Sequence, residues 1–227
     1  MQIAIFRDWK TIDYKEAWDK QQEIFNSVVD FKSGKTEVNN QSIIFCEHPH
    51  VYTLGKHGNN TNLLISDEML KKINATYYHI DRGGDITYHG PGQIVGYPII
   101  DLELCELSLK DYVFQLEQSV INTLENYQIK ATRLQGASGV WLDVDVPGRT
   151  RKICAIGVKA SRYVTMHGFA FNINTDLNYF NYINPCGFVD KGVTSLQIEL
   201  GREINIQEVK DILQNNLYKC LKLNEII

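Results

Sequence analysis

The sequence lacks any apolar run close to the roughly 18 consecutive residues of a membrane-spanning helix. Its first residues, Met1–Arg7, have neither the basic start nor the long apolar stretch of a signal peptide, and they predict a short strand instead. The sequence therefore predicts neither a membrane segment nor export. A net charge of −4 over 227 residues argues against nonspecific binding to nucleic acid.

No two cysteines stand in a CxxC pair, which argues against a zinc site or a redox dithiol. Five cysteines are scattered along the chain at positions 46, 105, 154, 186 and 220. Scattered thiols without a signal peptide indicate a reducing compartment, so we expect a cytoplasmic protein. His48 and His50 flank a proline with no cysteine nearby, which is poor spacing for a metal, and no metal is expected.

Internal repeats and low-complexity segments are also missing. With 44% hydrophobic and 22% charged residues, the chain can bury a full core, and its length suits one domain or one domain with a small appendage. Hydrophobic periodicity predicts helices over 15–29, about 108–127 (capped by Ser108) and from Asn205 to Cys220, with one or two helical turns over 67–73. Predicted strands cover 42–46, 77–80, 94–102, 139–144, 152–160 and 169–173. This mixture has no regular βαβ alternation and predicts an α+β fold.

What the sequence does have is a concentration of glycine in Arg82–Gln93, which reads RGGDITYHGPGQ. Glycine lets the backbone approach a ligand closely, and the polar side chains between the glycines can donate hydrogen bonds. A surface loop would have similar glycine content but less need for so many large polar groups. The stretch therefore predicts a binding loop.

Three further segments add to this pattern. Gly157 ends the apolar run Ile153–Ile156, the segment Met166–Asn172 reads MHGFAFN, and Asn184–Gly187 places a thiol in a turn of proline and glycine. Upstream, Glu47–Gly55 reads EHPHVYTLG. Together these blocks resemble the lipoyl(octanoyl) transferase family over about 47–200, roughly two thirds of the chain.

The resemblance implies a mixed β-sheet flanked by helices, of the biotin/lipoate protein ligase type. It implies a single catalytic domain over 1–227, with a core at about 36–213. It also implies transfer of an octanoyl group from octanoyl-acyl carrier protein to a lysine of a lipoyl domain, through a cysteine thioester. No cofactor is required, because the thioester donor is already activated. The implied acceptors are the lipoyl domains of 2-oxoacid dehydrogenase complexes and the glycine cleavage H protein.

By the same resemblance Cys186 is the nucleophile and Lys152 its catalytic partner. A nearby cation lowers the pKa of a thiol. Because strand residues alternate between faces, Lys152 shares a face with Cys154, whereas Lys159, the weaker candidate, lies opposite. The other cysteines are interpreted as buried core thiols. His89 and His167 are expected to shape the substrate site, although activation of the thiol by His89 remains open.

The expected substrate-binding residues come from the three glycine-containing blocks: Arg82, Gly83, Gly84, Asp85, Ile86, Thr87, Tyr88, His89, Ala155, Ile156, Gly157, Gly168, Phe169 and Ala170.

Acidic residues are missing between Asp145 and Asp176, a stretch that carries Arg149, Arg151, Lys152, Lys159 and Arg162. These could form an ordinary solvated face. Because acyl carrier proteins and lipoyl domains are typically acidic, the resemblance favours a positive patch that docks them.

Three other activities share part of the pattern. An ATP-dependent lipoate or biotin ligase would have the same fold but would need no cysteine nucleophile. A protein that only binds acylated carriers would need neither Cys186 nor Lys152. An amidotransferase that moves octanoate between lipoyl domains would use the same chemistry.

Overall fold

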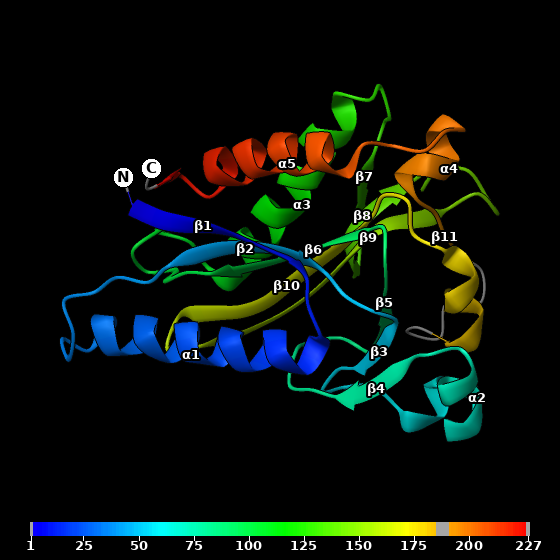
Figure 1. The fold of residues 1–227 in the computed structure, drawn as a ribbon. Coiled ribbons are helices and arrows are strands. Elements are labelled where there is room, and N and C mark those ends of the chain that lie inside the picture. Colours follow the sequence, from blue (N-terminus) through cyan, green and yellow to red (C-terminus); the bar gives the residue numbers. More distant parts are fainter. Residues whose placement is uncertain (1, 185–190, 226–227) are drawn as a thin grey trace.

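The computed structural model describes residues 2–184 and 191–225, and most of its strands join one large mixed sheet (Figure 1). The strands are β1 (Gln2–Thr11), β2 (Ser42–Glu47), β6 (Gln93–Ile99), β7 (Thr132–Leu134), β8 (Ala137–Leu142), β9 (Arg151–Ser161), β10 (Val164–Asn172), β11 (Gly192–Val193) and β12 (Leu223–Glu225). Their order is β12-β1-β2-β6-β10-β9-β8-β7, with β11 paired to β9. β1 runs parallel to β12 and β2, and the neighbours from β2 to β7 are antiparallel, so the predicted mixed sheet is confirmed.

Helices cover both faces of this sheet. α1 (Tyr14–Lys32) lies on one face, and α3 (Leu109–Glu125) and α5 (Ile206–Cys220) lie together on the other (Figure 1). The predicted cap of α3 is confirmed, since the Ser108 side chain accepts a hydrogen bond from the Asp111 backbone N–H. Asn205 caps α5 by accepting a hydrogen bond from the Gln207 backbone N–H.

The hairpin of β9 and β10 is longer than the sequence predicted. β10 begins at Val164 and not near Phe169, because a two-residue turn at Arg162 and Tyr163 pairs Ser161 with Val164. Both turn residues have positive φ, as the twist of a tight hairpin requires. His167 in β10 also has a positive φ, of 61°.

A second, three-stranded sheet lies below the large one in Figure 1 and was only partly predicted. It consists of β4 (Thr76–His79), β3 (Val51–Leu54) and β5 (Ile86–His89), with α2 (Asp67–Lys72) packed beside it. Tyr52 and Tyr88 are fully buried within it, and the Tyr52 hydroxyl donates to the carbonyl of Tyr179 at 2.9 Å. Tyr179 belongs to the 3₁₀ helix η2 (Leu177–Tyr182), so this sheet supports the chain that leads towards residue 186.

The remaining helices are the 3₁₀ helix η1 (Asn60–Asn62) and α4 (Leu196–Leu200). None of the helices in the described part of the chain is both long and apolar enough to cross a membrane.

Candidate active site

A pocket of about 400 Å³ lies between the large and small sheets, along β9. The pairing of β9 with β8 runs from Arg151 to Cys154, and beyond it the glycine-rich loop approaches β9, with the Gly83 N–H donating to the Val158 carbonyl at 2.9 Å. Every residue that the sequence predicted for substrate binding lines this pocket, apart from Tyr88, and so does Lys152. Blocks separated by up to 88 positions in the sequence therefore meet at one cavity.

Tyr88 is the exception among the predicted binding residues. Its side chain is fully buried in the small sheet, where its hydroxyl contacts the ring nitrogen Nδ1 of His50 at 2.7 Å. Side chains alternate along a strand, so Thr87 and His89 face the pocket while Tyr88 points into the core behind them. The prediction that Tyr88 contacts substrate is corrected accordingly, and its position indicates a supporting role.

Close backbone approach explains two of the pocket glycines. A Cβ atom on Gly157 would lie 2.9 Å from the carbonyl oxygen of Gly83, which is too close for a real side chain. Gly84 has a φ of +88°, a conformation that favours glycine. The glycine-rich loop can therefore lie against β9 and shape one wall of the pocket.

Arg82 is almost fully buried and holds this loop in place. Its Nη2 donates to the carbonyl oxygen of Thr53 at 2.6 Å and to the Thr53 hydroxyl at 3.0 Å, and its Nη1 donates to the carbonyl of Gly83. These bonds join the loop to β3 of the small sheet.

A series of buried polar groups, joined by hydrogen bonds, begins at Thr53 and crosses the floor of the pocket. The Thr53 hydroxyl lies 3.4 Å from Nε2 of His89, and Nδ1 of His89 lies 2.9 Å from Oε1 of Gln93. Burial lowers the pKa of His89 to about 3, so the ring is neutral at physiological pH. His89 therefore contributes a neutral imidazole to the pocket wall.

The same hydrogen-bonded series continues to Thr194, the residue that directly follows β11. Nε2 of Gln93 donates to Oδ1 of Asn172 at 2.9 Å, and Nδ2 of Asn172 donates to the carbonyl of Thr194 at 3.0 Å. The Thr194 N–H in turn donates to the carbonyl of Lys152 at 2.9 Å. Hydrogen bonds thus connect the glycine-rich loop to the backbone of Lys152 through the interior of the site.

The prediction that Lys152 and Lys159 lie on opposite faces of β9 is wrong. The register with β8 shifts by one residue, so that Cys154 pairs with Val140 and Lys152 pairs with Trp141. Adjacent residues of β8 face opposite sides, so Lys152 turns away from the face of Cys154 and onto the face of Lys159.

The ammonium of Lys152 lies 4.5 Å from the centre of the Trp141 ring, inside the pocket. The ammonium of Lys159 is 5.7 Å from the ring of Phe25 on α1, and it forms an ion pair with Asp81 at 2.5 Å. The pocket position agrees with the choice of Lys152 as the catalytic lysine.

His167 reaches the pocket from β10. Its Nε2 lies 2.9 Å from Oδ1 of Asp81, the carboxylate that also binds Lys159. Burial lowers the pKa of His167, while the contact with Asp81 opposes that shift. The pKa of Asp81 is lowered, mainly by the hydrogen bond from His167 and also by the one from Lys159. Burial acts in the opposite direction. Sequence analysis missed Asp81 because no local pattern shows that its partners lie some 80 residues away.

Cys154 faces away from Lys152 and is fully buried in the core beneath α3. Burial raises the pKa of its thiol, so the group stays protonated and unreactive. Cys46 and Cys105 are also buried, whereas Cys220 is only half-buried. The interpretation of these cysteines as structural thiols is confirmed for Cys154, Cys46 and Cys105.

The predicted nucleophile Cys186 lies outside the described residues. The described chain on both sides of it reaches the same pocket: Phe180 lines the pocket before it, and Lys191, Gly192 and Val193 line the pocket after it. The Asn184 N–H donates to the Asn62 carbonyl at 2.8 Å, which holds the upstream side against η1.

The basic residues of the acid-free stretch do not form one patch. Arg151 is bound to Glu199 and Asp143, Lys159 is bound to Asp81, and Lys152 is inside the pocket. Arg149 and Arg162 are exposed but stand at opposite ends of the eleven-residue strand β9, which spans about 36 Å. The expectation of a continuous docking patch was wrong, because the partner carboxylates come from distant parts of the sequence.

Comparison with known proteins identifies the family. The model of the lipoyl protein ligase A/B catalytic domain matches residues 13–218. An octanoyltransferase of Bacteroides fragilis (strain YCH46) is 58% identical over 218 residues, covering 96% of this chain and 98% of the relative. An octanoyltransferase of Parabacteroides distasonis is 54% identical over 215 residues, covering 95% and 97%.

Solved structures share the fold at low sequence identity. A bipartite lipoate protein ligase of Thermoplasma acidophilum superposes with a TM-score of 0.71 at 13% identity, covering 100% of this chain and 88% of that one. A biotin protein ligase of Aquifex aeolicus gives a TM-score of 0.51 at 13% identity, covering 98% and 70%. The predicted biotin/lipoate ligase-type fold is confirmed.

The chain therefore belongs to the lipoyl protein ligase A/B catalytic domain family. Its relatives at 54–58% identity over nearly the whole chain are octanoyltransferases, and the chain is an acyltransferase of that group.

Proposed function

We propose that the protein transfers an octanoyl group from octanoyl-acyl carrier protein to a lysine of a lipoyl domain, through a thioester on Cys186. The observation that carries this proposal is the meeting, in one pocket, of Lys152, the expected acyl-binding residues and the described chain on both sides of Cys186. A pocket of about 400 Å³ falls in the range of small-molecule sites and suits an acyl chain with part of its carrier arm.

The reaction divides into two balanced steps. The Cys186 thiolate attacks the thioester carbonyl, a tetrahedral intermediate forms, and the thiol of the carrier arm leaves with a proton. The lysine amine of the acceptor then attacks the octanoyl-enzyme, the amide forms, and the Cys186 sulfur leaves. Lys152 accepts the thiol proton in the first step and supplies or relays protons in the second, as a general acid and base.

Apolar side chains of the pocket provide the surface on which the acyl group can bind. Ile156 and Phe169 are directly paired on β9 and β10, and Val95 and Ala170, which are paired on β6 and β10, also line the pocket. An octanoyl chain against these side chains gains about 0.8 kcal/mol for each methylene removed from water. Water excluded in this way also protects the thioester from hydrolysis.

The proposed partners are octanoyl-acyl carrier protein as donor and the lipoyl domains of 2-oxoacid dehydrogenase complexes and the glycine cleavage H protein as acceptors. A cytoplasmic location is proposed with them, since the described cysteines are free thiols.

Arg149 is the basic residue of the acid-free stretch that is best placed to meet an acidic carrier. Its side chain is 69% exposed and stands two residues before the start of β9, near Lys152. We expect Arg149→Glu to raise KM for octanoyl-carrier protein several-fold at low salt and to leave kcat nearly unchanged. Arg162→Glu is the matched control at the far end of β9, well beyond the ~10 Å over which charges act at 0.1 M salt. Equal effects of the two variants on KM would contradict this assignment.

ATP dependence separates the proposed activity from that of a ligase. We expect octanoyl transfer from carrier protein to a purified lipoyl domain after apyrase treatment, and an octanoyl adduct on the enzyme by intact mass when the acceptor is omitted. A strict requirement for ATP with free octanoate as donor would identify a ligase, and the absence of any transfer would identify a binding protein. Faster transfer from an octanoylated lipoyl domain than from carrier protein would identify an amidotransferase.

A further inference from the structure

The short strand β11 fastens the chain that follows position 186 to the strand that bears Lys152. β11 pairs with β9 in parallel, with Gly192 opposite Arg151 and Val193 opposite Lys152. The Gly192 N–H donates to the Thr150 carbonyl at 3.0 Å, and the Thr194 N–H donates to the Lys152 carbonyl at 2.9 Å. A parallel pairing of only two residues is weak by itself, so the side chains around it decide how firmly β11 is held.

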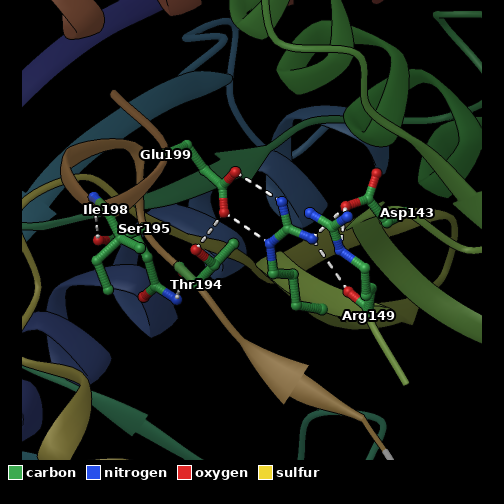
Figure 2. Close-up of polar contacts among 8 residues, drawn as sticks. Asp143, Arg149, Thr194, Ser195, Ile198 and Glu199 are labelled. Carbon is green, nitrogen blue, oxygen red and sulfur yellow. Dashed lines mark hydrogen bonds and ion pairs between the residues drawn. The ribbon is translucent and has the colours of Figure 1, made fainter. Parts of the chain in front are cut away.

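Those side chains form a compact group, shown in Figure 2. Arg151 donates from Nε to Oε1 of Glu199 and from Nη2 to Oε2 of Glu199, both at 2.7 Å. The Thr194 hydroxyl donates to the same Oε1 of Glu199 at 2.6 Å. Arg151, Thr194 and Glu199 are called the Glu199 clamp below.

Asp143 completes the surroundings of Arg151. Nη1 of Arg151 donates to Oδ2 of Asp143 at 2.6 Å, and Nε of Arg149 lies 3.8 Å from the same oxygen. The hydrogen bonds from Arg151 are the main reason that the pKa of Glu199 is lowered, so its carboxylate is charged at neutral pH. A bidentate pairing of guanidinium and carboxylate fixes orientation as well as distance.

The helix α4 places Glu199 for this contact. Ser195 caps α4 by accepting a hydrogen bond from the Ile198 N–H, and the fully buried Leu196 joins the core beneath α3 and α5. Glu199, in the last turn, reaches back past the cap to Thr194 (Figure 2). The carboxylate is therefore supplied by α4, a separate element that is anchored in the core through Leu196.

Thr194 also ends the buried hydrogen-bonded series that crosses the pocket floor, because its carbonyl accepts from Asn172. Its hydroxyl, N–H and carbonyl thus bind Glu199, Lys152 and Asn172 respectively. A shift of Thr194 would be transmitted to the backbone of Lys152 on one side and to the pocket floor on the other.

We propose that Glu199 is a positioning residue for acyl transfer: by holding Arg151 and Thr194 together, it fixes Lys152 relative to β11, the first described strand after Cys186. This inference rests on the proposed function. Displacing a catalytic group by about 1 Å can lower a rate by about 10²-fold without loss of substrate binding. The effect of the clamp should therefore appear in kcat and in the reactivity of Cys186, more than in KM.

The test compares Glu199→Gln and Thr194→Val with Thr194→Ser, which keeps the hydroxyl. Thr194→Val keeps the shape and the backbone bond to Lys152 but loses the bond to Glu199. We expect kcat for transfer from octanoyl-carrier protein to fall between about 10- and 100-fold in Glu199→Gln and about tenfold in Thr194→Val, with KM within about threefold. Thr194→Ser should stay within about twofold of wild type.

The second readout is the pH profile of Cys186 alkylation, followed on its own peptide by mass spectrometry. Both clamp-breaking variants should move its midpoint towards that of an ordinary thiol at about 8.5, and Thr194→Ser should restore it. Asp101→Asn is the matched structural control, because Asp101 is a buried partner of Lys32, at 2.8 Å, at the other end of the β10 strand. It should lose thermal stability but keep kcat and the alkylation profile.

The inference is overturned if Glu199→Gln and Thr194→Val lose only stability, as Asp101→Asn does, while kcat and the alkylation profile stay at wild-type values. Thr194→Val decides the matter if Glu199→Gln does not fold. Failure of the proposed function is seen separately, as transfer that persists in Cys186→Ser. In that case the clamp has no nucleophile to position, and the inference falls with it.

Discussion

Replacing Cys186 with serine should abolish octanoyl transfer, a loss of at least about 10³-fold, because acyl transfer needs a nucleophile that ionises near neutral pH. A serine hydroxyl cannot form its alkoxide there, whereas a cysteine thiol with a free pKa near 8.5 can be activated by a nearby cation. The measurement is transfer from octanoyl-carrier protein to a lipoyl domain, together with intact mass of the enzyme after incubation with donor alone. The variant should show neither product nor adduct.

Cys154→Ser is the matched control. Cys154 is the thiol nearest in sequence to Lys152, but it lies on the opposite face of β9, and burial raises its pKa and leaves it protonated. The serine hydroxyl is close in size, so this variant should retain most of its activity at some cost in stability. An inactive Cys154→Ser beside an active Cys186→Ser would reverse the assignment of the nucleophile.

Lys152→Ala is expected to lower kcat by about 10²-fold or more, the usual effect of losing a general acid or base. The alkylation midpoint of Cys186 should rise towards about 8.5, because the cation that favours the thiolate is gone. Lys159→Ala should leave both quantities nearly unchanged, since its ammonium is paired with Asp81 on the α1 side of the sheet. Iodoacetamide reactivity as a function of pH, resolved to the Cys186 peptide, distinguishes the two variants.

A profile that shifts in Lys159→Ala and not in Lys152→Ala would assign the catalytic role to Lys159 instead. Arg151 stands next to Lys152 in the sequence and carries two acidic partners in the structure. The Arg151 guanidinium is bound by Glu199 and Asp143, so its charge is largely compensated.

Helices and their caps were predictable because their signals are local. Ser108 precedes an apolar repeat of helical period, and the helix begins where this pattern indicates. Strand boundaries were harder, since they depend on pairing partners. β3 and β5 have only four residues each and were missed as strands, although the residues of both stood in blocks that were recognised as functional.

The lining of the pocket was predictable from motifs, but the contacts that hold the pocket together were not. Glycine-containing motifs indicate where the backbone can approach a ligand closely. This local signal does not depend on how far apart the motifs lie in the sequence. Glu199 and Asp81 carry no such signal, because their partners Arg151 and His167 lie 48 and 86 residues away. The same ion pairs explain why a run of basic residues without acidic ones did not produce a basic surface.

The buried series from Thr53 to Thr194 has a direction that is imposed by its carbonyl groups. The Tyr88 and Thr194 carbonyls can only accept, so the amide nitrogens of Gln93 and Asn172 must face them. Oε1 of Gln93 therefore faces His89, and the ring proton of His89 must reside on Nδ1. The network thus selects one tautomer of a histidine in the pocket wall and leaves the lone pair of Nε2 on the side of Thr53, so that exchanging the tautomer would require both amides to rotate together.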